Sequence, residues 1–170
     1  MSGHFNYVNF YNSIEKWLNS HEKALKLLLF LYKYMSWAIA ASYGVLIIYC
    51  IACKDAFSTV KVITVPLTVF IVVTVLRYCI DCKRPYTKYP IHPLVVKDKT
   101  GESMPSRHMV SITIIAMVWL YICIPVGIIL WILSIVMGTV RVLTGVHFPR
   151  DIIVAAIVSI ILGYIGLWIL

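Results

Sequence analysis

The sequence predicts an all-α fold: a polytopic bundle of about five transmembrane helices, preceded by an amphipathic helix at the membrane interface. Hydrophobic residues make up 61% of the 170 residues, and the mean hydropathy is +0.90. A soluble domain of ordinary composition is roughly 45–50% apolar, so this chain is suited to a lipid environment. Apolar stretches also recur at close to the ~20 residues with which a helix crosses a bilayer. The apolar–polar alternation typical of transmembrane β-strands is absent from the sequence.

The N-terminal segment, residues 1–20, carries the amphipathic pattern. Apolar side chains recur there every three or four positions, at Tyr7, Phe10, Tyr11, Ile14, Trp17 and Leu18. Such a helix either lies in the membrane interface or docks as a short helix against the bundle, and both alternatives stay open. The segment lacks the apolar core of a signal peptide, so we expect no cleavage.

Five apolar segments follow in order. They cover about residues 20–53, 60–80 and 106–122, then a segment that runs to about 140 after a turn at IPVG (124–127), and a last one that follows Asp151. The polar stretch between the second and third segments is rich in proline and predicts a structured loop. In an antiparallel arrangement, the end of the second span, the start of the third and the link between the last two share one membrane face. We therefore predict a single domain over residues 1–170, with its functional core at residues 77–151.

Seven ionisable side chains would meet at this face: Arg77, Arg84, Arg107, His108, Arg141, His147 and Asp151. Ionisable groups beside the hydrocarbon core are costly and indicate a functional site, unless they are single anchors that reach the surface. Guanidinium groups bind phosphate oxygens in a planar fork. Ser106, at the start of a predicted helix, adds a hydroxyl group and free backbone amides. The set predicts a phosphate ligand.

The two histidines allow two chemical roles. His147 precedes Asp151 by four residues, about one helical turn, so the carboxylate can accept the Nδ1 proton and leave Nε2 as a nucleophile. His108 comes from another element at the same face and could protonate a departing oxygen.

These residues resemble the three motifs of the type 2 phosphatidic acid phosphatase (PAP2) superfamily, often written K-x6-R-P, P-S-G-H and S-R-x5-H-x3-D. The matching stretches are RYCIDCKRP at 77–85, PSRH at 105–108 and RVLTGVHFPRD at 141–151. Three positions depart from the pattern: Arg77 replaces lysine, Arg107 replaces glycine and Val140 replaces serine. Any one motif alone is a weak signal, whereas three in the same order are a strong one.

The resemblance implies a metal-independent lipid phosphatase that works through a phosphohistidine. It assigns the chemistry to His147, His108 and Asp151, and phosphate binding to Arg77, Arg84, Ser106, Arg107 and Arg141. Undecaprenyl pyrophosphate and phosphatidylglycerophosphate are the leading substrate candidates, and no cofactor is implied. Two alternatives stay open: a phosphotransferase using the same phosphohistidine, and a non-catalytic lipid-binding subunit.

The partners implied are a membrane and a lipid phosphate. The net charge of +8 is spread over short loops and does not form the basic stripe of a nucleic-acid-binding surface. Two C-x-x-C pairs, Cys50/Cys53 and Cys79/Cys82, form a common zinc pattern. Antiparallel spans place these pairs on opposite membrane faces, ~35–40 Å apart, so we predict no metal site.

The orientation in the membrane follows from two opposing arguments. Of the 15 Lys and Arg residues, only Lys54 and Lys61 lie on the predicted face opposite the site, so the positive-inside rule alone favours a cytoplasmic site. Several of the other cations serve the chemistry, however, and relatives that process cell-wall lipids face outward. We therefore predict a multi-pass protein of the cell membrane whose site faces outward.

Overall fold

The computed structural model describes residues 7–96 and 98–170, which form an all-helical bundle without any strand. The first six residues of the predicted amphipathic segment lie outside the described residues. The elements in chain order are α1 Tyr7–Ser20, α2 Glu22–Cys53, α3 Ala56–Ile80, α4 Pro85–Lys88, α5 Arg107–Ile122, α6 Ile124–Leu143, α7 Pro149–Tyr164 and a π-helical turn, η1, Ile165–Ile169. The predicted fold class is confirmed.

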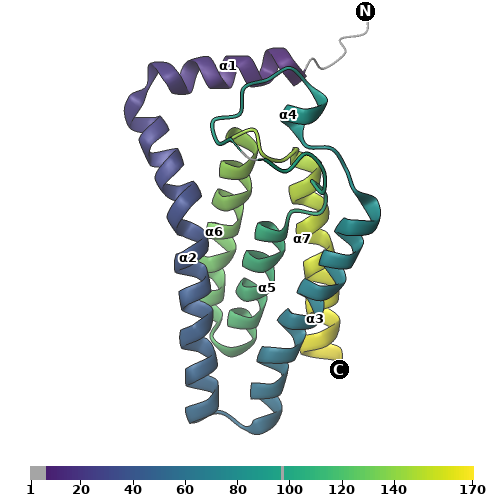
Figure 1. Cartoon of the computed structure of the whole chain (residues 1–170). Helices are drawn as coiled ribbons and strands as arrows, with labels where there is room; N and C mark the ends of the chain where they lie inside the picture. Colours follow the sequence, from purple (N-terminus) through teal and green to yellow (C-terminus); the bar gives the residue numbers. More distant parts are fainter. Residues whose placement is uncertain (1–6, 97) are drawn as a thin grey trace, which may run out of the picture.

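Four segments of the described chain are long and apolar enough to cross a membrane: Glu22–Cys53, Ala56–Lys88, Ile124–Leu143 and Pro149–Ile169. The remaining predicted span is α5, which has only 16 residues. Figure 1 shows α5 in the middle of the bundle, surrounded by α2, α3, α6 and α7. Nearly every α5 residue from Met109 to Val118 is buried. Because α5 is apolar on nearly all sides, other helices can cover it completely. It is too short to cross a bilayer by itself.

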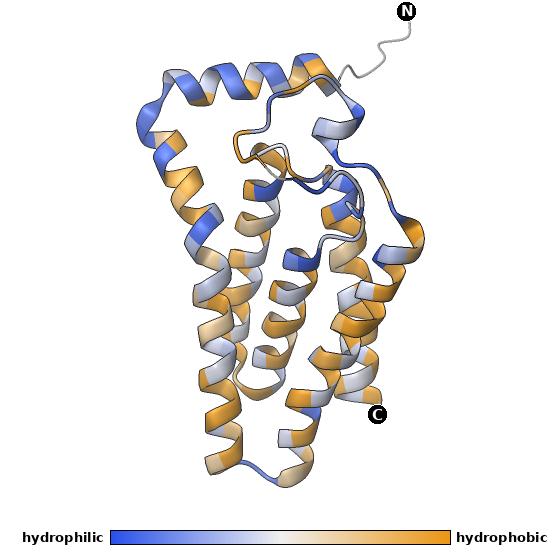
Figure 2. Cartoon of the chain, in the orientation of Figure 1, coloured by the Kyte–Doolittle hydropathy of each residue, from blue (hydrophilic) through white to orange (hydrophobic). Residues whose placement is uncertain are grey.

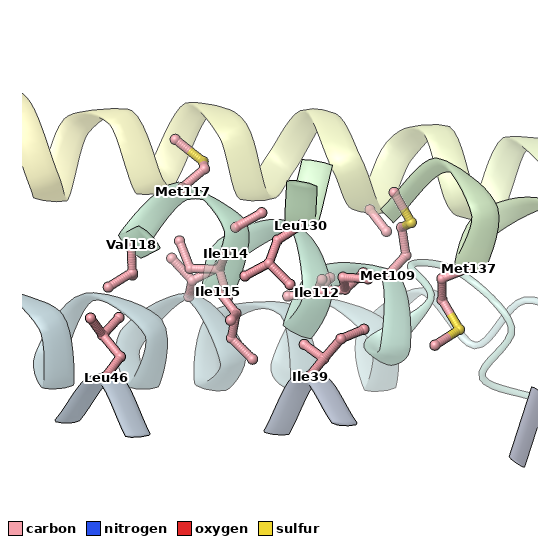
Figure 3. Close-up of a cluster of buried hydrophobic side chains, with 14 of the residues drawn as sticks. Ile39, Leu46, Met109, Ile112, Ile114, Ile115, Met117, Val118, Leu130 and Met137 are labelled. Atoms are coloured by element: carbon pink, nitrogen blue, oxygen red, sulfur yellow. The ribbon is translucent and has the colours of Figure 1, made fainter. Parts of the chain in front are cut away.

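The core of the bundle forms around α5. Figure 3 shows Ile39 and Leu46 of α2 reaching toward the α5 side chains, with Leu130 and Met137 of α6 in the same cluster. Leu46 is completely buried. The outward faces of the long helices are also apolar, as the hydropathy colouring in Figure 2 shows. Trp37 and Ile135, for example, are 75% and 66% exposed. An apolar exterior of this extent is suited to lipid.

The α1 helix crosses one end of the bundle, above the loops that connect the other helices (Figure 1). The Tyr7 ring lies 5.2 Å from the ring of Tyr89 and 5.1 Å from that of Phe148. The Tyr11 hydroxyl accepts a hydrogen bond from the backbone N–H of Leu94 at 3.3 Å. Trp17 stays 55% exposed. The structure therefore shows α1 docked against the bundle, which is one of the two predicted alternatives. The helix still presents an apolar side chain, Trp17, outward.

Candidate active site

A cavity of about 410 Å³ lies where α3 and α6 end and α5 begins. Its lining comes from α3, the long polar loop, α5, α6 and the link before α7. The residues are Arg77, Arg84, Val96, Asp98, Lys99, Arg107, His108, Arg141, Val146 and His147. The structure therefore brings six of the eight sequence-predicted site residues to one cavity. The other two, Ser106 and Asp151, are fully buried behind it.

Three guanidinium groups at this cavity are buried: Arg77, Arg84 and Arg141 are 3%, 4% and 2% exposed. Arg77 donates from Nη1 to the Pro105 carbonyl at 3.3 Å, and its Nε lies 3.5 Å from the Glu102 carboxylate.

Arg84 donates from Nε to the Gly101 carbonyl at 3.1 Å. Within the described residues, no carboxylate lies within 4.0 Å of Arg84 or Arg141. Buried charges are normally paired, so these cations make the cavity suited to an anion.

Arg141 is held from the side by α2. Its Nη2 donates to the Ser36 hydroxyl at 3.0 Å, and its guanidinium carbon lies 4.2 Å from the centre of the Tyr32 ring. The contact over the ring is a cation–π interaction. Tyr32 and Ser36 are four residues apart, which places them on one face of the helix. Neither residue was predicted from the sequence, in which their i, i+4 spacing was the only signal.

His147 and Asp151 form a buried pair. Nδ1 of His147 lies 3.6 Å from Oδ2 of Asp151. The same oxygen accepts from the Phe148 N–H at 3.0 Å, so the carboxylate also caps the N-terminus of its own helix. Burial lowers the pKa of His147 below its ordinary value. Its imidazole is therefore neutral at pH 7, as a nucleophile requires.

A residue outside the predicted set completes this pair. Ser103 is fully buried, and its hydroxyl donates to Oδ2 of Asp151 at 2.5 Å. The same hydroxyl oxygen lies 3.5 Å from Nδ1 of His147. In the sequence the only signal for Ser103 was its place two residues before the P-S-R-H stretch.

Ser106 and the next two residues form the start of α5. Ser106 is the N-cap of the helix, and its N–H donates to the Asp151 carbonyl at 3.2 Å. Its hydroxyl oxygen is buried without a hydrogen-bond partner among the described residues. His108, the second residue of the helix, lines the cavity together with His147. Ser106 thus ties α5 to α7, whereas the side chains of Arg107 and His108 line the cavity.

A second, larger pocket opens beside the first. It has a volume of about 680 Å³ and is lined by Leu29, Tyr32, Lys33, Ser36, Trp37, Ala40, His108 and Arg141. His108 and Arg141 line both pockets. Trp37, which lines this pocket, is mostly exposed, so the pocket opens toward the apolar exterior of the bundle.

The described residues contain no group of three or more His, Cys, Asp and Glu side chains arranged to hold a metal ion. The two C-x-x-C pairs lie at the far end of α2 and at the end of α3 that borders the cavity. All five cysteines are free.

Comparison with known proteins places this geometry in context. The family model of the PAP2 superfamily matches residues 58–170. The structure of LpxE from Aquifex aeolicus is similar, with a TM-score of 0.61 and 20% identity over 84% of this chain and 93% of that one. The first transmembrane PAP2 type phosphatidylglycerolphosphate phosphatase from Bacillus subtilis gives a TM-score of 0.57 and 18% identity over 92% of this chain and 90% of that one. At these identities the likeness concerns the fold. A search of curated proteins found no match.

Proposed function

This chain belongs to the PAP2 superfamily of lipid phosphatases, and from that premise we propose that it hydrolyses a membrane lipid phosphate or diphosphate through a phosphohistidine on His147. One observation carries the proposal. Three buried guanidinium groups with little counter-charge surround a cavity that His147 and His108 also line.

In the first step, the lone pair of His147 Nε2 attacks phosphorus in line with the bond to the lipid oxygen. The new P–N bond forms as the P–O bond breaks, and His108 donates a proton to the departing oxygen. Asp151 stabilises the positive charge that develops on the imidazole, because its carboxylate lies 3.6 Å from Nδ1.

In the second step, water attacks the phosphohistidine. His108, now neutral, accepts the proton of the water as the P–O bond forms and the P–N bond breaks. Inorganic phosphate leaves, and both histidines return to their starting states. The arginines hold the three equatorial oxygens through both steps, which supplies the positioning and charge stabilisation that phosphoryl transfer requires.

The route of the lipid follows from the second pocket. A lipid whose phosphate lies among the arginines would extend past His108 into the pocket beside α2, where Leu29, Trp37 and Ala40 are apolar. The leaving oxygen would then lie at His108, the residue that both pockets share. This arrangement supports a membrane lipid over a soluble phosphate ester.

Two substrate candidates are supported by different observations. A relative of the same fold is named for phosphatidylglycerolphosphate, which supports phosphatidylglycerophosphate. Arg107 and Lys99 add two cations to the cavity beyond the three buried arginines, which supports a diphosphate such as undecaprenyl pyrophosphate.

The experiment incubates the purified protein in detergent with these two lipids and phosphatidic acid, in the presence of EDTA, and measures released inorganic phosphate. We expect turnover with at least one lipid, loss of turnover in His147→Ala, and normal turnover in His92→Ala, whose imidazole is exposed in the loop. Equal activity of His147→Ala would exclude the assigned nucleophile, and abolition by chelation would exclude a metal-free mechanism. A phosphorylated acceptor in place of free phosphate would identify a transferase, and absence of turnover with every lipid would favour a binding subunit.

We also propose that the site faces outward. In a variant without the other cysteines, native Cys53 reports the face opposite the site, and Lys88→Cys reports the site face, since both positions are exposed. A membrane-impermeant maleimide added to intact cells is expected to label position 88 and to spare Cys53. The opposite result would place the site in the cytoplasm.

A further inference from the structure

We propose that Ser103 is a positioning residue of this active site, whose hydroxyl group fixes the carboxylate of Asp151 and thereby the orientation of His147. The inference rests on the proposed function. Ser103 lies outside the three motifs and was not among the residues expected from the sequence.

The hydroxyl group lies between the two members of the pair. Ser103 Oγ is 2.5 Å from Asp151 Oδ2 and 3.5 Å from His147 Nδ1, while Nδ1 and Oδ2 are 3.6 Å apart. All three residues are at most 2% exposed, so water does not compete for these contacts. A serine hydroxyl has one proton to donate, and the short distance assigns it to the carboxylate.

This assignment leaves the Ser103 oxygen as an acceptor that faces the imidazole. The Nδ1 proton of His147 then points at two oxygens, the Ser103 hydroxyl and Asp151 Oδ2, and both favour the tautomer with a free lone pair on Nε2. Without the hydroxyl, Oδ2 would keep only the Phe148 N–H and the longer contact with His147 Nδ1 among the described residues.

The other carboxylate oxygen, Oδ1, is buried without a hydrogen-bond partner among the described residues. It lies 3.6 Å from Nε of Arg150, whose side chain is 55% exposed. Loss of the Ser103 bond would therefore free the carboxylate to turn away from His147.

The loop that carries Ser103 is fixed to the end of α3. The Ser103 N–H donates to the Cys82 carbonyl at 2.8 Å, and the Glu102 N–H donates to the Asp81 carboxylate at 2.9 Å. The backbone therefore places the hydroxyl independently of the His147–Asp151 pair. A group anchored in this way can orient a partner, because it does not move with that partner.

The test compares Ser103→Ala and Ser103→Cys with the control Ser159→Ala. Cysteine keeps nearly the volume of serine but is a weak donor. Ser159 is likewise fully buried, on the same helix as Asp151, and within the described part of the chain its hydroxyl bonds only to the Ala155 carbonyl. We expect both Ser103 variants to lower kcat about 10- to 100-fold, as the loss of an orienting partner typically does, with KM within about twofold. Ser159→Ala is expected to keep the wild-type kcat.

A double-mutant cycle separates orientation from mere packing. If Ser103 acts mainly through the Asp151 carboxylate, Ser103→Ala lowers phosphate release much less in an Asp151→Asn background than in the wild type. A wild-type kcat in Ser103→Cys, or an equal loss in both backgrounds, would overturn the proposal. Thermal unfolding of each variant in detergent identifies a folding defect. If Ser103→Ala does not fold, the kcat of Ser103→Cys tests the proposal in its place. An inactive wild type or an active His147→Ala would instead count against the proposed function, whatever the Ser103 variants show.

Discussion

Substitution of Asp151 by asparagine tests the most important electrostatic contact of the site. The carboxylate lies 3.6 Å from His147 Nδ1, and at an effective dielectric constant of about 20 a unit charge pair at that distance interacts by about 4.6 kcal/mol. Each 1.36 kcal/mol changes a rate tenfold. The charge on His147 appears only as phosphorus is attacked, so this energy acts on the transition state. We expect Asp151→Asn to lower kcat by about three powers of ten.

The fold should tolerate this change, because the asparagine side-chain oxygen can still accept from the Phe148 N–H and the Ser103 hydroxyl. The loss of charge in these bonds costs about 1 kcal/mol of unfolding free energy. The assay follows phosphate release from the preferred lipid, together with thermal unfolding in detergent. Asp55→Asn, at the N-cap of α3 on the opposite face, is the matched control. A loss of less than tenfold in Asp151→Asn, with Asp55→Asn at wild-type activity, would refute the role of the carboxylate.

Three further predictions concern the surroundings of the pair. Because burial lowers the pKa of His147, the acid-side fall in kcat/KM, corrected for ionisation of the substrate phosphate, should begin only below about pH 6.5; an acid-side fall that begins above pH 7 would contradict this. The unfolded chain binds that proton first, so the free energy of unfolding also falls as the pH drops below about 6.5. Arg141→Lys should raise KM about tenfold, since an ammonium group replaces neither the planar fork nor the stacking on Tyr32; an unchanged KM would count against it. Gly145→Ala should destabilise the protein by more than about 1 kcal/mol, because φ is +74° and the new Cβ would lie 2.5 Å from the Tyr11 hydroxyl, and an unshifted unfolding midpoint would disprove the strain.

The helical segments could be predicted from the sequence because long apolar runs have few alternatives in a bilayer. The predicted span at residues 60–80 corresponds to α3, Ala56–Ile80, and the one at 106–122 to α5, Arg107–Ile122. The role of α5 could not be predicted in the same way. An apolar side chain has the same hydropathy whether lipid or another helix covers it, and only the packing shows that α5 is the centre of the bundle.

The arrangement of the site could be predicted only in part. Motif spacing and antiparallel connectivity were enough to bring Arg77 and His147 to one end of the bundle. The contact of Ser36 with Arg141 joins positions 105 residues apart, and no local pattern encodes it. The same holds for Ser103, whose hydroxyl meets a carboxylate 48 residues away. Such contacts depend on how the helices are turned about their axes, which hydropathy does not determine.

The cost of burying the arginines links stability to ligand binding. Arg84 and Arg141 have neutral partners, the Gly101 carbonyl and the Ser36 hydroxyl. Neutral dipoles satisfy hydrogen bonds but leave the positive charge largely uncompensated, and a buried charge without a counter-charge is unfavourable. A phosphate dianion that enters the cavity therefore meets a positive field that the fold has already built. Two carboxylates oppose it there among the described residues: Glu102, which contacts Arg77 from a partly exposed position, and Asp98, which lines the cavity. The buried arginines therefore lower the stability of the fold by themselves and raise the affinity of the cavity for an anion.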